Sequence, residues 1–156
     1  MKLFFPVLAL LAPLTAPQAW AAEGVTLTSQ TFVEKTETGP AGQPVTVRKE
    51  PGIVTPGDKV VFVLSYHNGG ARPATGFVLT NPVPDAITYA GSDDAAAVVS
   101  VDGGKTWGPL AAQKVRLPDG TSRPAAAADV THVRWPFAQA VAAGGSGRVS
   151  YRGVVK

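Results

Sequence analysis

The chain has 156 residues, with 14 lysines and arginines against 11 aspartates and glutamates, two histidines and no cysteine. This length fits about one ordinary globular domain. A formal charge of +3 is too small for a surface built to bind nucleic acid or an anionic membrane. The missing cysteines exclude disulfides, thiolate nucleophiles, iron–sulfur clusters and Cys-ligated metals. Two histidines are too few for a three-histidine zinc site, so we expect no cofactor.

The first 22 residues, MKLFFPVLALLAPLTAPQAWAA, have the pattern of an export signal. One lysine precedes an apolar stretch from Leu3 to Leu14, and Ala19-Trp20-Ala21 is a small-x-small cleavage site. An uncleaved membrane anchor is the competing interpretation, but prolines interrupt the stretch and it is shorter than the ~20 apolar residues of a span. We therefore predict a signal peptide over residues 1–21, cleaved after Ala21 or Ala22. The mature chain would have no membrane span and would be periplasmic or extracellular, at the cell surface.

Next in chain order come short β-branched and aromatic runs, separated by Gly, Pro, Asn and Asp clusters. No window has a sustained apolar period of 3.6 residues, so helix is nearly absent. The stretch 124–128 is read as a loop with room for one helical turn. We predict an all-β fold, an immunoglobulin-like β-sandwich of two antiparallel sheets with about eight or nine short strands. The expected strands are Val25–Lys35, Pro44–Lys49, Lys59–His67, Thr75–Thr80, Ala86–Tyr89, Ala97–Val101, Lys114–Leu117, Val130–Trp135 and Gly147–Val155.

Alternation of side chains along these strands predicts which residues are inside. In the strand 59–67 the larger, uniformly apolar set faces the core, while Val61 and Val63 make the outer face partly apolar. The same alternation turns Arg148, Ser150 and Arg152 outward in the last strand. The predicted inward residues are Val60, Phe62, Leu64, Tyr66, Val133, Trp135, Val149, Tyr151 and Val155.

Several motifs carry a resemblance to a known family. Thr55-Pro56-Gly57-Asp58-Lys59-Val60 leads into an alternating strand and the turn Asn68-Gly69-Gly70, followed by Phe77-Val78-Leu79-Thr80-Asn81 and Val83-Pro84. Together with the hairpin sequence 100–107, these motifs resemble the bacterial surface-repeat family called domain of unknown function 11, in a single copy over about residues 44–156. The resemblance implies an immunoglobulin-like sandwich in exported envelope or surface proteins, without established catalytic residues. Residues 22–43 would then be a strand and linker that precede this domain.

Catalytic candidates are few. Ser65 and His67 lie two apart on one strand face, as a nucleophile and its base would, but acyl transfer also needs an orienting carboxylate and oxyanion donors. No G-x-S-x-G elbow is present, and residues 144–147 read as a turn. The sequence therefore favours a non-enzymatic protein. A small periplasmic hydrolase using Ser65, His67 or His132 is the second alternative.

The acidic residues raise the question of calcium. Asp93 and Asp94, with Asp85 or Asp102 nearby, could supply oxygen ligands, of which Ca²⁺ takes about six to eight. A solvated acidic loop explains the same residues, so these aspartates are weak candidates and no metal site is predicted.

Aromatic and basic residues suggest a binding surface. Arg134, Arg148 and Arg152 fall on outward positions of strands that could be neighbours, and would form a basic stripe facing an anionic polymer. Ordinary edge-strand charge, which blocks aggregation, is the explanation that we favour for them. Trp107 could stack on a sugar, whereas Trp135 is expected in the core.

These observations favour an exported, non-enzymatic envelope or surface protein that acts as a structural or protein–protein interaction module through its loops or sheet edges. The alternative is a binding module for an envelope glycan or anionic polymer through Trp107 and the arginine stripe. The expected partner is an envelope or surface protein, or else a polysaccharide, and not nucleic acid.

Overall fold

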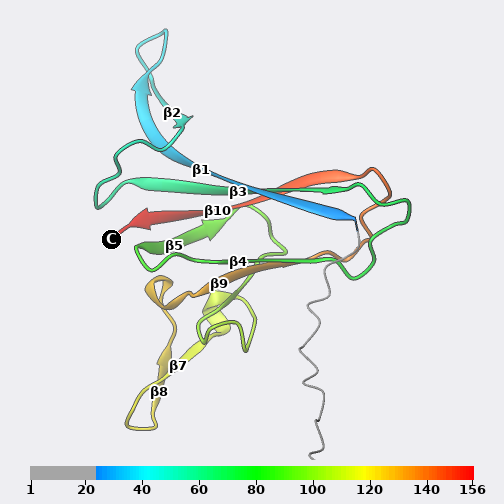
Figure 1. Cartoon of the computed structure of the whole chain (residues 1–156). Helices are drawn as coiled ribbons and strands as arrows, with labels where there is room; N and C mark the ends of the chain where they lie inside the picture. The colour runs from blue at the N-terminus through cyan, green and yellow to red at the C-terminus, as the bar shows by residue number, and fades with distance from the viewer. Residues whose placement is uncertain (1–23) are drawn as a thin grey trace, which may run out of the picture.

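The structure is a computed structural model that describes residues 24–156, so the predicted signal peptide lies outside the described residues. The described chain is all-β, with ten strands and two single-turn 3₁₀ segments (Figure 1). The strands are β1 Val25–Thr38, β2 Pro44–Lys49, β3 Lys59–Asn68, β4 Val78–Pro82, β5 Ile87–Ser92, β6 Val98–Ser100, β7 Lys114–Arg116, β8 Ser122–Pro124, β9 His132–Pro136 and β10 Ser146–Val155; the 3₁₀ segments are η1 Leu110–Ala112 and η2 Ala127–Asp129.

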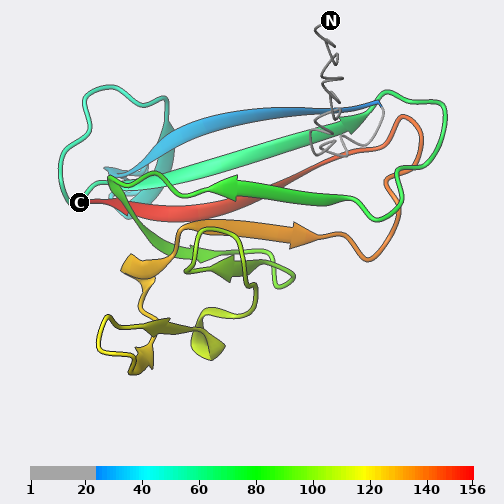
Figure 2. The ribbon, with the colours of Figure 1, turned by 60° about the horizontal axis from the view of Figure 1, so that its bottom comes forward.

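All strand pairings are antiparallel. The large sheet has the order β2-β1-β3-β10-β5, a smaller one has the order β4-β9-β6, and β7 pairs with β8 alone. The large and small sheets pack against each other, because the core draws buried side chains from both. Figure 2 gives a second view of them, and the tips of the β1–β2 and β7–β8 hairpins project from the body in Figure 1. All nine expected strands are found, and η2 supplies the single turn allowed after residue 124. The sequence analysis missed β8, since Ser-Arg-Pro has no β-branched residue and contains a proline.

The core lies between the two sheets. Leu64, Val149 and Tyr151 of the large sheet are buried there, together with Val133 and Trp135 of the small sheet. These five residues confirm the inward alternation predicted for their strands. They also show why the sheets stay together, because burial of each large apolar side chain contributes roughly 1.5–3 kcal/mol.

The outer face of the large sheet is also partly apolar, as predicted. Val61 is fully buried there although the small sheet lies on the other side. Its cross-strand neighbours are Phe32 on β1 and Arg152 on β10. The Arg152 side chain reaches diagonally over β3 to Glu34, and the aliphatic stem of an arginine in such a position can cover apolar surface.

The pairing of β1 changes how the chain divides. The sequence analysis set residues 22–43 apart as an N-terminal strand and linker, whereas β1 pairs with both β2 and β3 and so belongs to the large sheet.

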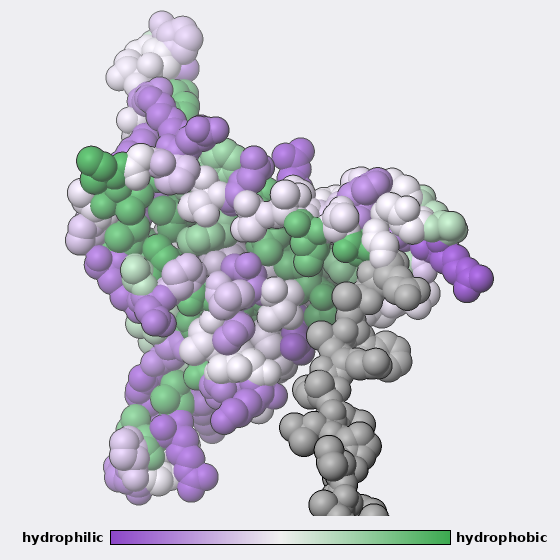
Figure 3. Space-filling model, viewed as in Figure 1, coloured by the Kyte–Doolittle hydropathy of each residue, from purple (hydrophilic) through white to green (hydrophobic). Residues whose placement is uncertain are grey.

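The β2–β3 connection exposes Ile53 (97%) and Val54. An apolar patch is visible at that end of the molecule in Figure 3.

Candidate functional site

A shallow hollow of about 400 Å³ lies on the outer face of the large sheet. The register aligns Thr28, Ser65 and Arg148 across β1, β3 and β10, and places His67 beside Ser146. The hollow is thus lined by hydroxyls, an imidazole and a guanidinium. Within residues 24–156, no salt bridge neutralises Arg148, so the hollow can accept an anionic group.

Ser65 and His67 line the same hollow, but they do not form a nucleophile–base pair. His67 Nδ1 shares a hydrogen bond of 2.8 Å with Ser146 Oγ rather than with Ser65. In the described part of the chain no carboxylate hydrogen-bonds to His67 to orient it. His132 lies on β9 in the other sheet and shares a hydrogen bond with Thr131. The arrangement therefore lacks the base–orienter pair that an activated serine needs.

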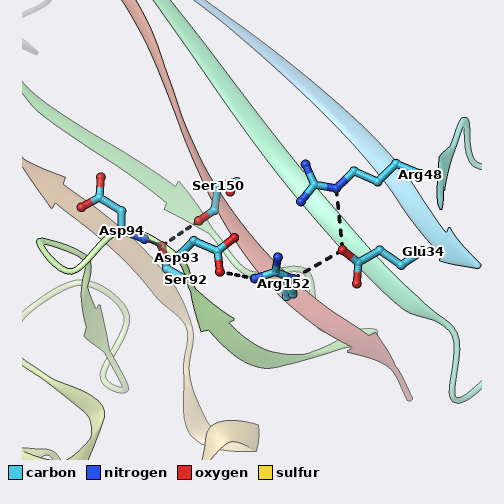
Figure 4. A network of polar contacts seen from close by, with 7 residues as sticks. All are labelled: Glu34, Arg48, Ser92, Asp93, Asp94, Ser150 and Arg152. Atoms are coloured by element: carbon cyan, nitrogen blue, oxygen red, sulfur yellow. Dashed lines mark hydrogen bonds and ion pairs between the residues drawn. The ribbon is translucent and has the colours of Figure 1, made fainter. Parts of the chain in front are cut away.

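A row of ion pairs crosses the outer face near Val61 (Figure 4). Arg48 Nε lies 3.7 Å from Glu34 Oε1, which lies 3.4 Å from Arg152 Nε, and Arg152 Nη1 lies 2.5 Å from Asp93 Oδ1. The hydrogen bond from Arg152 lowers the pKa of the Asp93 carboxyl. Arg152 is therefore already neutralised by two acids, which weakens it as a ligand for an anionic polymer.

The calcium candidates are separately engaged. Asp93 faces Arg152, while Asp94 points away from it in Figure 4 and accepts the N–H of Ala96 at 2.9 Å. No group of three or more His, Cys, Asp or Glu that could hold a metal ion exists among residues 24–156. The aspartates order a loop and do not form an oxygen cage.

Asp102 has a similar structural role. It accepts hydrogen bonds from the Ser100 hydroxyl at 2.7 Å and from the backbone N–H groups of Lys105 (3.0 Å) and Thr106 (2.9 Å), as well as from the Thr106 hydroxyl at 2.6 Å. These bonds, led by the one from the Thr106 hydroxyl, hold the pKa of Asp102 well below its usual range. The loop that precedes Trp107 is therefore held in place by hydrogen bonds between its own residues.

This loop lays Trp107 against the outer face of the small sheet. The Arg134 guanidinium carbon is 3.6 Å from the ring centroid, a cation–π contact, and the indole N–H donates to the Gly104 carbonyl at 3.0 Å. The side chain is half-buried. One ring face is thus occupied by Arg134, leaving less of Trp107 for a sugar than the sequence suggested.

The arginine stripe does not form. Arg134 is on β9 of the small sheet, whereas Arg148 and Arg152 are on β10 of the large sheet. All three point away from the core, since their neighbours Val133, Trp135, Val149 and Tyr151 point into it. Because the two sheets pack core to core, Arg134 lies on the opposite side of the molecule from the other two.

Comparison with known proteins gives no match to a family model, a curated protein or a solved structure. Among residues 24–156 no helix is long and apolar enough to cross a membrane. A function must therefore be argued from the surface itself.

One edge of the large sheet stands out. β1 pairs with β3 along Val25–Glu34 but with β2 only along Val33–Thr38. On the β2 side, no strand among residues 24–156 pairs with residues 25–32, and we call this stretch the β1 edge. Its sequence, VTLTSQTF, has no charge, proline or glycine. Residues 26–30 are all exposed, and Leu27 is 57% exposed.

Proteins usually block such edges with charges, prolines or bulges. The neighbouring strand β2 follows that rule, with Pro44, Arg48 and Lys49. At the other end of the sheet, the β5–β10 pairing contains a bulge. The β1 edge has none of these devices. The sequence analysis named sheet edges only in general, although eight consecutive uncharged residues in a predicted strand were a usable signal.

Proposed function

We propose that this chain is an exported, non-enzymatic envelope or surface protein that works as a protein–protein interaction module built on an immunoglobulin-like sandwich. The leader sequence and the resemblance to domain of unknown function 11 support export to the envelope. The two facing antiparallel sheets support the sandwich. The observation that carries the interaction role is the β1 edge, where a partner strand can add to the sheet through main-chain hydrogen bonds.

The test is cross-linking in the source cells, with the tagged full chain expressed at its native level. The variant Ser29→Lys places a positive charge on the β1 edge, and such a charge opposes strand addition. Ser122→Lys is the matched control, because it adds the same charge at an exposed serine of β8. We expect a discrete adduct with another polypeptide for the wild type and Ser122→Lys, and its loss with Ser29→Lys. Monomer alone in every sample would refute the proposal.

Binding of an anionic envelope polymer is a second candidate, favoured by the hollow beside Arg148. Replacement of Arg148 by glutamine removes the one guanidinium that lines it. Arg116→Gln is the control, since Arg116 is also exposed but lies on β7. Pull-down on acidic polysaccharide should be weakened by Arg148→Gln and not by Arg116→Gln. Equal retention of both variants would remove this candidate.

A further inference from the structure

We infer that the partner of the β1 edge is a second copy of the same chain, which pairs β1 with β1 antiparallel about a two-fold axis at Thr28. This inference rests on the interaction role proposed above and names the partner. It follows from three properties of the edge: which hydrogen-bonding groups point outward, which residues would face each other, and where charges lie.

The outward groups are identified by the pairing with β3. The Gly69 N–H donates to the Gly24 carbonyl at 2.8 Å. Because adjacent residues of a strand point their N–H and C=O groups to opposite sides, even-numbered residues bond to β3. Residues 25, 27, 29 and 31 therefore present theirs along the β1 edge, where nothing within residues 24–156 accepts them.

A two-fold axis at Thr28 uses all of these groups. It places Val25 opposite Thr31 of the second copy and Leu27 opposite Ser29, so that each outward residue meets another outward residue. An axis at Ser29 would place Val25 opposite Val33, which already pairs with Lys49 of β2. An axis at Leu27 would leave Thr31 without a partner from residues 24–156. Thr28 is thus the centre that satisfies the whole edge.

The charge pattern favours a second copy over an unrelated strand. Every residue that would be paired is uncharged, so no like charges meet across the two-fold axis, where identical residues lie close together. The first charged residue after the edge, Glu34, is held by Arg48 and Arg152. Pairing also covers Leu27, the exposed apolar side chain of the edge. A two-fold pair is closed, because the β1 edge of each copy is consumed.

Eight-residue strands bury less area than a standard interface, so we expect a dissociation constant on the order of micromolar. Sedimentation velocity of the purified full-chain product, at concentrations from about 1 to 500 µM, should show a monomer–dimer equilibrium. Ser29→Lys and Ser29→Glu should each weaken dimerisation at least ~10-fold, and an equimolar mixture of the two should recover it. Ser122→Lys should behave as wild type.

The lack of cysteine allows a direct test of the register. At a non-hydrogen-bonded antiparallel pair the Cα atoms are about 4.5 Å apart, within the range that a disulfide spans. Thr28→Cys should therefore form a disulfide dimer on oxidation. Ser29→Cys should not, because residues two positions out of register are about 7–8 Å apart.

The outcomes separate this inference from the proposed function. A monomer at all concentrations with no Thr28→Cys dimer, or cross-linking by Ser29→Cys in place of Thr28→Cys, would overturn pairing about Thr28. Open-ended aggregates in place of a dimer would also overturn it. If the cellular adduct sensitive to Ser29→Lys then contained a different protein, the interaction role would stand and the second copy would not.

Discussion

Asn68 provides the sharpest test of how the loops are held together. Its side chain is fully buried at the end of β3. The amide nitrogen donates to the carbonyls of Arg72 (2.8 Å), Val141 (2.9 Å) and Ala142 (3.2 Å), while Oδ1 accepts the N–H of Gly70 at 3.0 Å. One side chain thus joins the connection after β3 to the one before β10.

The expected cost of Asn68→Ala can be worked from these contacts. An amide group has only two hydrogens, so the three carbonyls share about two full bonds, and the Gly70 bond adds a third. At about 1 kcal/mol each, the free energy of unfolding should fall by about 3 kcal/mol. Asn68→Asp should cost at least as much at neutral pH, because a carboxylate oxygen would then face the carbonyl oxygens.

Urea unfolding followed by tryptophan fluorescence measures this loss. Asn81→Ala is the matched control. Within residues 24–156 the half-buried Asn81 amide donates to two acceptors, the Pro82 carbonyl and the Tyr151 hydroxyl, so at the same value per hydrogen bond its loss should cost about 2 kcal/mol. A loss for Asn68→Ala no larger than that for Asn81→Ala would refute the reasoning.

Three further predictions concern packing and titration. A Cβ at Gly153 would collide with Ile87, so Gly153→Ala should lower the free energy of unfolding by about 1–3 kcal/mol. Gly52→Ala is the control and should change this free energy little, because a Cβ at Gly52 would lie in open space. Equal effects of the two variants in urea unfolding would contradict this packing. The Arg123 hydrogen bond lowers the pKa of Asp129 to about 2 from 3.8, so this carboxylate stabilises the fold above about pH 4 and loses its contribution as the pH falls towards 2. The stability difference between wild type and Asp129→Asn should close over that range, and a constant difference would be evidence against the ion pair. Burial raises the pKa of Tyr151 to about 12. In an absorbance titration of the folded protein, Tyr151 should therefore be the last tyrosine to ionise as the pH rises. That last transition should be absent from Tyr151→Phe.

Much of the fold could be predicted because strands repeat every two residues. The alternation alone assigned Leu64, Trp135 and Tyr151 to the core, and all three are buried. The turn motifs marked where the strands end, because a turn depends on residues that are neighbours in the chain. Asn68 was read only as a turn residue, since nothing local shows that the backbone of residues 141–142 lies against it.

The candidate site was less predictable because it depends on which strands are neighbours. β9 and β10 follow each other in the chain and both alternate arginines with apolar residues, so a shared face was a natural expectation. The chain instead passes from the small sheet to the large one between residues 136 and 146, which separates Arg134 from Arg148. Asp93 was likewise read as a loop carboxylate, because only the fold brings Arg152 to it.

The position of β10 has a consequence for how the molecule comes into being. This strand lies between β3 and β5 and is the last of the described strands to be synthesised. A nascent chain that stops before residue 146 has one side of β3 bare and lacks Val149 and Tyr151 from its interior. Contacts so distant along the chain form slowly. The polypeptide should thus stay open until β10 emerges from the ribosome, and an open polypeptide can be threaded through a narrow pore before it folds.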